Sequence, residues 1–278
     1  MGDAPSFWAS WFVWRDAMAA AVLSAAALSS LGVWVALKRV VYVPLALSQV
    51  SSVGVVAAFL LGDLLARGGV EGAFFDPAWM SLLFAALASL YFARAREKSG
   101  DATAVAYLLS AAAVLILGGF IRNDIHDIQS ILFGDAVLVE MRQVVIVASV
   151  AALATATHAL FYRRFLFASF DGDTAGAAGI PVFRTEALLF VSLAVTISVA
   201  TRVIGALPAF GFTVLPPLAA LRLGGSMRRV MILSTAIGIF SAGVGYYLSF
   251  IWELPTGACM VALMGMTYLA GRTFKART

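Results

Sequence analysis

Nine long apolar segments, separated by short polar stretches, constrain the fold of this chain more than any other feature of its sequence. A helix needs roughly 20 residues to cross the hydrocarbon core of a membrane. Helices are the spans to expect, because every backbone polar group must be satisfied within the segment. The sequence therefore predicts an all-α membrane protein: a polytopic bundle of 8–9 transmembrane helices in a single transmembrane domain, residues 1–278. The apolar segments are residues 16–37, 43–65, 77–93, 102–121, 141–162, 185–201, 203–221, 230–251 and 254–271.

The seventh segment, residues 203–221, decides between eight and nine spans. It contains Pro208, Pro216 and Pro217, and each proline removes a backbone donor and can kink or break a helix. Two interpretations are open: a broken helix that lines a cavity, or a kinked span without a special role. A proline-rich piece can also be re-entrant, which would leave eight spans.

Charged residues give the chain an orientation. If all nine segments cross, 14 of the 19 Lys and Arg residues lie on one side and 5 on the other. The positive-inside rule makes the first side cytoplasmic, with the N-terminus outside and the C-terminus inside. Of the 15 carboxylates, 10 lie outside and 5 inside. The acidic outer face either concentrates cations at an entrance or only completes the topology bias. The bases form no patch with interleaved aromatics, so no nucleic-acid partner is expected.

Several classes of chemistry have no motif in the sequence. It lacks a P-loop, an H-E-x-x-H motif and a G-x-S-x-G motif, and its single cysteine excludes a Cys-rich metal site. The centres of the apolar segments contain no Asp, Glu, Lys or Arg, which disfavours a proton-coupled carrier. The deep polar groups concentrate in "LSQVSSVG", with Ser48 and Ser52 on one helical face and Gln49 beside Ser52. These groups either line a substrate path or hold two helices together.

Two loops carry further candidate residues. The stretch "RNDIHDIQSILFGD" is predicted to lie on the extracytoplasmic side of the membrane. It contains side chains that suit divalent metals: Asp124, His126, Asp127 and Asp135. They line a metal entrance or cap helix ends.

The cytoplasmic stretch around residues 163–184 contains "FDGDTAGAAGIP". We expect a short helix there, capped by Asp171 or Asp173 and ended by Gly179. This helix serves as a docking element for a soluble partner, or the stretch is a plain connecting loop.

Three regions resemble the membrane permease of zinc/manganese/iron-type ABC importers, the ABC-3 family. They are "LGVWVALKRVVYVPLALSQ", "DIQSILFGD", and "FDGDTAGAAGIPVFRTEALLF" followed by "RVIGALPAFGFTVLPPLAALRL". The resemblance implies a non-enzymatic subunit in the bacterial inner membrane, with ATP-Mg on a separate ABC ATPase. It also implies an extracytoplasmic substrate-binding protein and a second permease copy or paralogue. It places Asp171, Asp173, Ala175 and Gly179 in the ATPase-coupling element.

The chain departs from this family at its metal-ligand positions. The family's D-A-L-S-H motif reads Leu45 and Gln49 here, and the histidine of its loop is Gln129. Amides are poor ligands for borderline transition metals. Besides His126 only His158 remains, and we expect that residue at the membrane interface. The predicted pathway residues are Ser48, Gln49, Ser52, Asp127 and Gln129.

The function predicted from the sequence is a permease for a divalent metal cation or a metal-related solute, without a confident metal site in this chain. A secondary carrier without an ATPase partner is the alternative, and a non-transporting membrane scaffold is a third interpretation.

Overall fold

The computed structural model describes residues 7–8, 11–67, 76–95, 99–120 and 139–275. This part of the chain is helical and contains no strand, which confirms the predicted all-α class. Each of the nine predicted apolar segments falls on a long helix, and two short helices follow the fifth. The helices are α1 (Trp11–Leu37), α2 (Tyr42–Arg67), α3 (Pro77–Ala95), α4 (Ser99–Phe120), α6 (Met141–Leu160), α7 (Tyr162–Phe170), α8 (Gly172–Ala177), α9 (Val182–Ile204), α10 (Ala206–Leu223), α11 (Met227–Trp252) and α12 (Thr256–Lys275).

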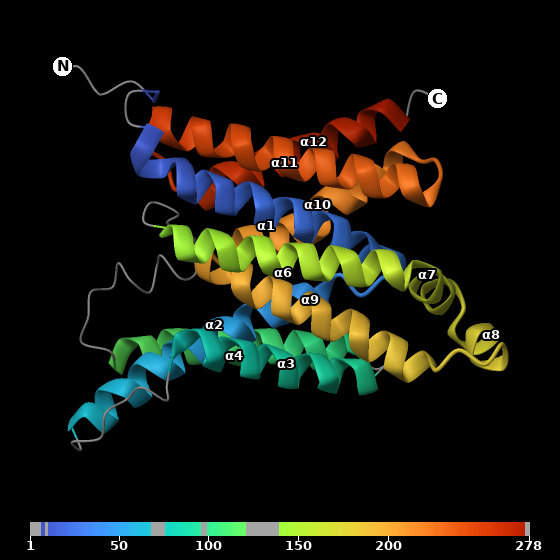
Figure 1. Cartoon of the computed structure of the whole chain (residues 1–278), viewed down its shortest axis with the longest axis horizontal. Helices are drawn as coiled ribbons and strands as arrows, with labels where there is room; N and C mark the ends of the chain where they lie inside the picture. The colour runs from blue at the N-terminus through green and yellow to red at the C-terminus, as the bar shows by residue number, and fades with distance from the viewer. Residues whose placement is uncertain (1–6, 9–10, 68–75, 96–98, 121–138, 276–278) are drawn as a thin grey trace.

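The long helices run side by side across the molecule (Figure 1). Among the described residues, eight of them are long and apolar enough to cross a membrane. The ninth, α12, has a shorter apolar stretch, Thr256–Gly271. The count of eight or nine therefore depends on the last helix. The proline-containing α10 meets the length requirement.

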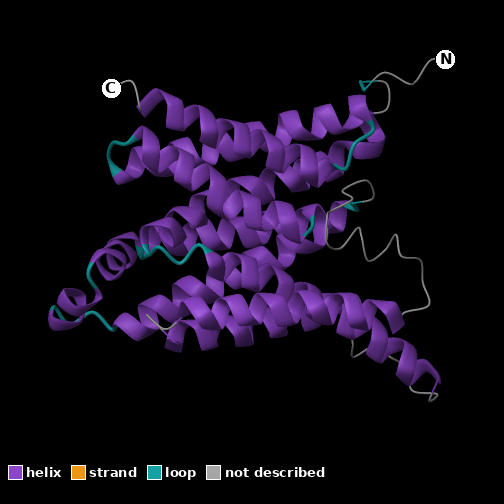
Figure 2. Ribbon diagram, turned by 180° about the vertical axis from the view of Figure 1, so that it is seen from behind, coloured by secondary structure: helices purple, strands orange, loops and turns teal. Residues whose placement is uncertain are grey.

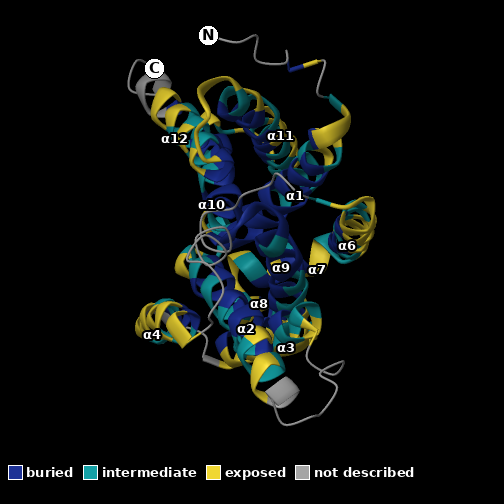
Figure 3. Cartoon of the chain, turned by 90° about the vertical axis from the view of Figure 1, so that its left-hand side faces the viewer, coloured by how far each residue is buried: buried dark blue, intermediate teal, exposed yellow. Residues whose placement is uncertain are grey.

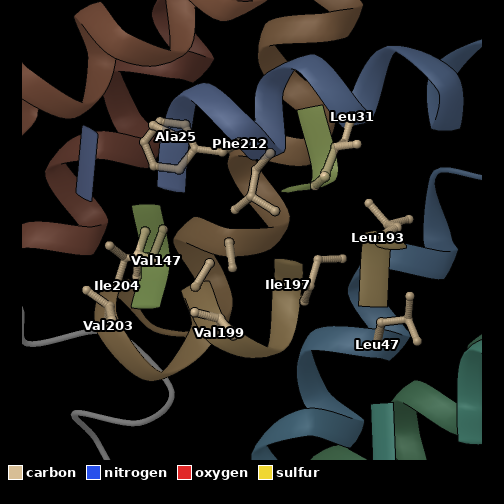
Figure 4. Close-up of a cluster of buried hydrophobic side chains, with 14 of the residues drawn as sticks. Ala25, Leu31, Leu47, Val147, Leu193, Ile197, Val199, Val203, Ile204 and Phe212 are labelled. Atoms are coloured by element: carbon tan, nitrogen blue, oxygen red, sulfur yellow. The ribbon is translucent and has the colours of Figure 1, made fainter. Parts of the chain in front are cut away.

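The helices form two groups joined through α9. Helices α1, α10, α11 and α12 pack together on one side and α2, α3 and α4 on the other, while α9 contacts both groups and α6 packs against α1 and α9 (Figures 1 and 2). In both α1 and α9, 67% of the most apolar stretch is buried, compared with 17% in α6 (Figure 3). Side chains from α1, α2, α6, α9 and α10 meet in one buried cluster that includes Phe212 and Ile197 (Figure 4). Helix α9 is therefore the centre of the bundle and α6 belongs to its periphery.

The seventh predicted segment, residues 203–221, is interrupted at Gly205 and not at its prolines. Helix α9 ends at Gly205, whose φ of 85° favours glycine, and α10 then runs unbroken from Ala206. Pro208 lies in the first turn of α10, where the backbone N–H has no partner within the helix. Pro216 and Pro217 lie inside α10, where each deprives a carbonyl one turn earlier of its donor.

Small residues let the helices approach closely. A Cβ on Gly32 of α1 would lie 2.0 Å from the Thr213 carbonyl oxygen of α10. A Cβ on Gly245 of α11 would lie 2.8 Å from Met260 Cα of α12. Backbone therefore meets backbone at both contacts, and neither leaves room for a side chain.

Contacts at the helix ends agree with the predicted order of crossings. At the basic end, Lys38 after α1 forms an ion pair with Glu186 at the start of α9 (Nζ to Oε1, 2.7 Å). The guanidinium of Arg94 near the end of α3 lies 5.8 Å from the ring centroid of Phe183. Each pair joins loop ends that the charge distribution assigns to the cytoplasmic side.

Candidate functional site

The polar segment of α2 contains two serines that are satisfied by their own helix. Ser48 and Ser52 are fully buried. The Ser48 hydroxyl donates to the Leu45 carbonyl (2.9 Å), and the Ser52 hydroxyl donates to the Ser48 carbonyl (3.1 Å). Such bonds are a common solution for hydroxyls inside membrane helices. Both hydroxyl protons are therefore engaged, and these two predicted pathway residues are packed inside the chain.

Gln49 and Ser51 differ from these serines because their buried polar atoms have unused bonding capacity. Gln49 is half-buried, and its Oε1 has no hydrogen-bond partner among the described residues. The Ser51 hydroxyl is also buried without such a partner. An unpaired buried polar group carries a free-energy cost of about 1–3 kcal/mol. Gln49 is thus the predicted pathway residue best suited to bind a group from outside the chain. Leu45, one turn before it, is also half-buried.

The described residues hold no group of three or more His, Cys, Asp or Glu side chains that could bind a metal ion. The predicted entrance and loop residues lie outside these residues: Asp124, His126, Asp127, Gln129 and Asp135. Within the described part of the chain, α2 therefore offers an amide, hydroxyls and an alkyl side chain where the resembling family has metal ligands.

His158 is a buried packing residue near the end of α6 that the charge distribution assigns to the cytoplasmic side. It lies on the last turns of α6 and is only 5% exposed. Its Nε2 is 2.7 Å from the Ser192 hydroxyl of α9. Its ring lies 4.7 Å from that of Phe165 and 6.2 Å from that of Trp34, centroid to centroid. The imidazole faces inward: Ser192 contacts Nε2 and aromatic rings surround the side chain, while Nδ1 is buried without a hydrogen-bond partner among the described residues.

Helix α8 forms where the sequence predicts a capped helix. The Asp171 side chain is the N-cap and accepts hydrogen bonds from the backbone N–H groups of Asp173 and Thr174 (3.1 and 3.0 Å). Gly179 follows the C-cap with φ of 81°. The Ile180 N–H bonds back to the Ala175 carbonyl (3.0 Å), which closes a Schellman motif. Both predicted ends are confirmed, and Asp171 is the cap of the two candidates.

The charge of Asp171 is stabilised by the same cap. The hydroxyl of Thr174 donates to its carboxylate, and this bond is the largest cause that holds the pKa of Asp171 below its ordinary value. The backbone N–H groups of Thr174 and Asp173 act in the same direction. Asp171 is therefore ionised at neutral pH, as a cap at the positive end of a helix requires.

Helix α8 projects from the basic end of the bundle, beyond α7 and the start of α9 (Figure 1). Its Ala175 is fully buried, whereas Asp173, Gly176 and Ala177 are exposed. Of the residues predicted for coupling, Asp171, Asp173 and Gly179 are exposed and can contact a partner directly. Ala175 is buried and anchors the helix.

Sequence reasoning missed the ion pair that anchors this region. The Lys38 ammonium contacts Glu186 and also donates to the Ala168 carbonyl of α7 (3.2 Å). Both charged side chains are only 12% exposed. Because 148 residues separate Lys38 from Glu186, no local pattern could have paired them. The pair connects α1 to both segments that flank α8.

Comparison with known proteins agrees with this geometry. Residues 11–275 match the model of the ABC 3 transport family. The manganese transport system membrane protein MntD of Bacillus subtilis is 27% identical over 271 residues, covering 92% of this chain and 90% of the relative. For MntC of Halalkalibacterium halodurans, a protein of the same description, these values are 26% over 248 residues, 89% and 82%.

The fold is similar to a chain in the structure of PsaBC from Streptococcus pneumoniae in complex with Fab. The TM-score is 0.80 at 22% identity, over 92% of this chain and 90% of that chain.

The match extends from the start of α1 to the end of α12, so it covers the whole bundle. Together with eight membrane-length helices among the described residues, it identifies a multi-pass protein of the bacterial inner membrane. The resemblance carried by the three sequence regions is thereby confirmed. The chain belongs to the ABC 3 transport family.

Proposed function

We propose that this chain is the permease subunit of an ATP-driven importer and forms its transmembrane permease domain over residues 1–278. The observation that carries the proposal is the family match over residues 11–275. The capped helix α8, which projects from the basic end of the bundle, supports it. A short rigid helix on this side offers a docking element for a soluble subunit, with residues 163–184 as the coupling loop.

The proposal requires partner chains. ATP and its Mg²⁺ bind to a separate ABC ATPase, since this sequence contains no P-loop, and this subunit itself catalyses no reaction. An extracytoplasmic binding protein delivers the solute to the acidic outer face. A second copy or a paralogous permease completes the pathway, because one chain offers a single coupling loop for two ATPase subunits.

The substrate class is a divalent metal or a metal-related solute. Two relatives are named as manganese transport proteins, which favours manganese over zinc. Of the predicted pathway residues, Gln49 is proposed to line the pathway at membrane depth, with Asp127 and Gln129 nearer its mouth, while Ser48 and Ser52 pack behind it. We propose that α2 does not provide a high-affinity zinc site, because a neutral amide cannot offset the dehydration of a doubly charged ion.

Transport by reconstituted vesicles tests the main proposal. The permease is combined with an ABC ATPase and a binding protein from the same organism, and accumulation of Mn²⁺, Fe²⁺ and Zn²⁺ is measured with and without ATP. We expect ATP-dependent accumulation of at least one metal. Uptake driven by an ion gradient without the ATPase would instead establish the alternative of a secondary carrier.

Helix α8 provides a variant that tests coupling. Ala177→Trp adds bulk to an exposed position of α8 and should abolish ATPase co-purification. Leu160→Trp at the end of α6, where the side chain is 79% exposed, is the matched control and should retain it. Normal ATPase binding by Ala177→Trp would exclude α8 as the docking element.

Zinc titration in detergent tests the α2 position. Replacing Leu45 by Asp and Gln49 by His restores the ligand types of the resembling family one helical turn apart. We expect tight zinc binding by this double variant and none by the wild type. A Leu45→Asn, Gln49→Asn variant is the control that keeps neutral amides. Tight zinc binding by the wild type, lost in Gln49→Ala, would contradict the proposal.

Native mass spectrometry of the transport-competent complex tests the stoichiometry. We expect two permease chains and two ATPase chains. A functional complex with one permease chain would reject the paired arrangement.

A further inference from the structure

A cavity of about 190 Å³ opens between α7 and the first two turns of α9. Phe161, Phe165 and Leu188 supply much of its apolar wall, and Arg164 and Arg184 are its basic lining residues. It belongs neither to the α2 segment nor to helix α8. The five residues come from two segments that meet only in the folded chain.

The cavity lies at the depth where the cytoplasmic leaflet of the membrane would place its headgroups. Helix α6 ends at Leu160, immediately before the cavity residue Phe161, and α9 enters the bundle from Pro181. Leu160 on one side and Leu188 on the other are exposed. Both are suited to contact lipid tails. The apolar wall is thus continuous with surface that faces the hydrocarbon region.

The charges of the cavity have no counterion among the described residues. Arg164 and Arg184 are exposed and form no ion pair there. Glu186, the acidic residue nearest Arg184 in sequence, is held by Lys38 at 2.7 Å. The Arg164 guanidinium lies 5.5 Å from the ring centroid of Phe161, so it is placed over the apolar wall. Phe165 beneath is only 1% exposed and fixes that wall.

Two guanidinium groups beside an apolar wall match one ligand chemistry. A phosphate group pairs well with arginine, which presents several donors in a planar fork. An attached acyl chain would cover the phenyl and leucine side chains. Basic pockets between helices on the cytoplasmic side are a recurring form of recognition site for anionic lipid headgroups. A free phosphate would leave the apolar wall uncovered.

We propose that this cavity binds an anionic phospholipid of the cytoplasmic leaflet. Arg164 and Arg184 bind the headgroup phosphate, and Phe161 and Leu188 contact the first part of an acyl chain. The lipid joins α7 to α9, the two helices that flank α8. The site is independent of the transported solute and of the proposed ATPase partner.

Native mass spectrometry of the delipidated full-length chain tests the site. Phosphatidylglycerol and phosphatidylcholine with identical acyl chains are titrated separately. We expect wild type to prefer phosphatidylglycerol. The Arg164→Gln, Arg184→Gln variant should lose about tenfold or more of that affinity, because each base near a membrane surface contributes on the order of fivefold. Arg164→Lys, Arg184→Lys should retain part of it.

Arg163→Gln is the matched control. Arg163 is exposed on the same helix but does not line the cavity, so its loss should cost clearly less affinity than the loss of a lining arginine. An equal loss in this variant would overturn the proposal in favour of a diffuse surface charge. Gel filtration and circular dichroism establish that each variant is folded. If the double variant misfolds, Arg184→Gln alone is compared with Arg163→Gln.

Two further measurements separate other occupants. Glycerol phosphate at millimolar concentration should not displace the lipid, and full displacement would reduce the cavity to a simple anion site. ATPase co-purification is measured with the same variants. Loss of ATPase binding with unchanged lipid affinity would overturn the proposal and make the cavity a protein docking surface.

Discussion

The contact between α1 and α10 makes a stability prediction that can be worked from the structure. Gly32 packs against the Thr213 carbonyl, which lacks its usual helical donor because residue 217 is proline. A Cβ at residue 32 would lie 2.0 Å from that oxygen, whereas ordinary contact begins at 3.4 Å. Gly32→Ala therefore forces the two backbones apart by about 1.4 Å. Backbone cannot rotate away as a side chain could.

The expected cost follows from two opposing effects. Overpacking a tight interior costs about 1–3 kcal/mol, and the upper part of this range applies because both groups in contact are backbone. Alanine recovers about 1 kcal/mol of helix propensity. We expect a net destabilisation of about 2 kcal/mol for Gly32→Ala. At roughly 2–4 °C for each kcal/mol, the unfolding midpoint should fall by about 4–8 °C.

Gly265 provides the matched control, because a Cβ there would meet nothing within 4 Å in the middle of α12. Gly265→Ala should keep only the gain in helix propensity and raise the midpoint slightly. Midpoints are measured by thermal unfolding of the purified variants in one detergent. If Gly32→Ala unfolds at or above the wild-type midpoint, the close approach of α1 to α10 is wrong.

The remaining predictions concern topology and the region around α8. In a variant without the natural cysteine, single cysteines at Gly172 and Asn123 should be labelled from opposite sides of the membrane, and labelling of both from one side would contradict the assigned topology. Lys38→Met should destabilise the chain by about 1–3 kcal/mol, because it leaves the partly buried Glu186 carboxylate without its cation. Adding Glu186→Gln removes that unpaired charge and should restore part of the lost stability. If the two substitutions instead destabilise the chain additively, the ion pair is not supported. Asp171→Ala should weaken ATPase co-purification while Asp171→Asn retains it, because only asparagine keeps a capping oxygen; equal binding by both variants would show that the cap is not needed.

The structure confirms the sequence prediction wherever the physical cause is local. The length of each apolar segment is enough to identify the long helices, because a continuous apolar segment in lipid has few secondary structures open to it other than a helix. The ends of α8 could also be predicted, since Asp171 and Gly179 act on backbone groups within three or four residues. In both cases the residues that decide the structure are neighbours in the sequence.

Sequence reasoning failed where the deciding contact joins distant segments. Three prolines suggested a break inside α10, yet Pro208 occupies a first turn that needs no donor, and α1 packs closely against α10 at the Thr213 carbonyl. The sequence neighbours of His158 likewise do not show that Ser192 of α9 and the surrounding aromatic rings bury it. In both places the deciding contact comes from a helix that is distant in the sequence.

Gln49 differs from both groups of residues, because its Oε1 has no hydrogen-bond partner either nearby in the sequence or elsewhere in the described part of the chain. Ser48 and Ser52 show that α2 can satisfy its own hydroxyls through the preceding turn. A glutamine amide is too long to bond its own helix in this way, and the described residues leave its Oε1 without a partner. A buried group of this kind costs stability in the isolated chain. A donor from a solute or from a second permease chain would recover that cost, as the proposed place of Gln49 in the transport pathway expects.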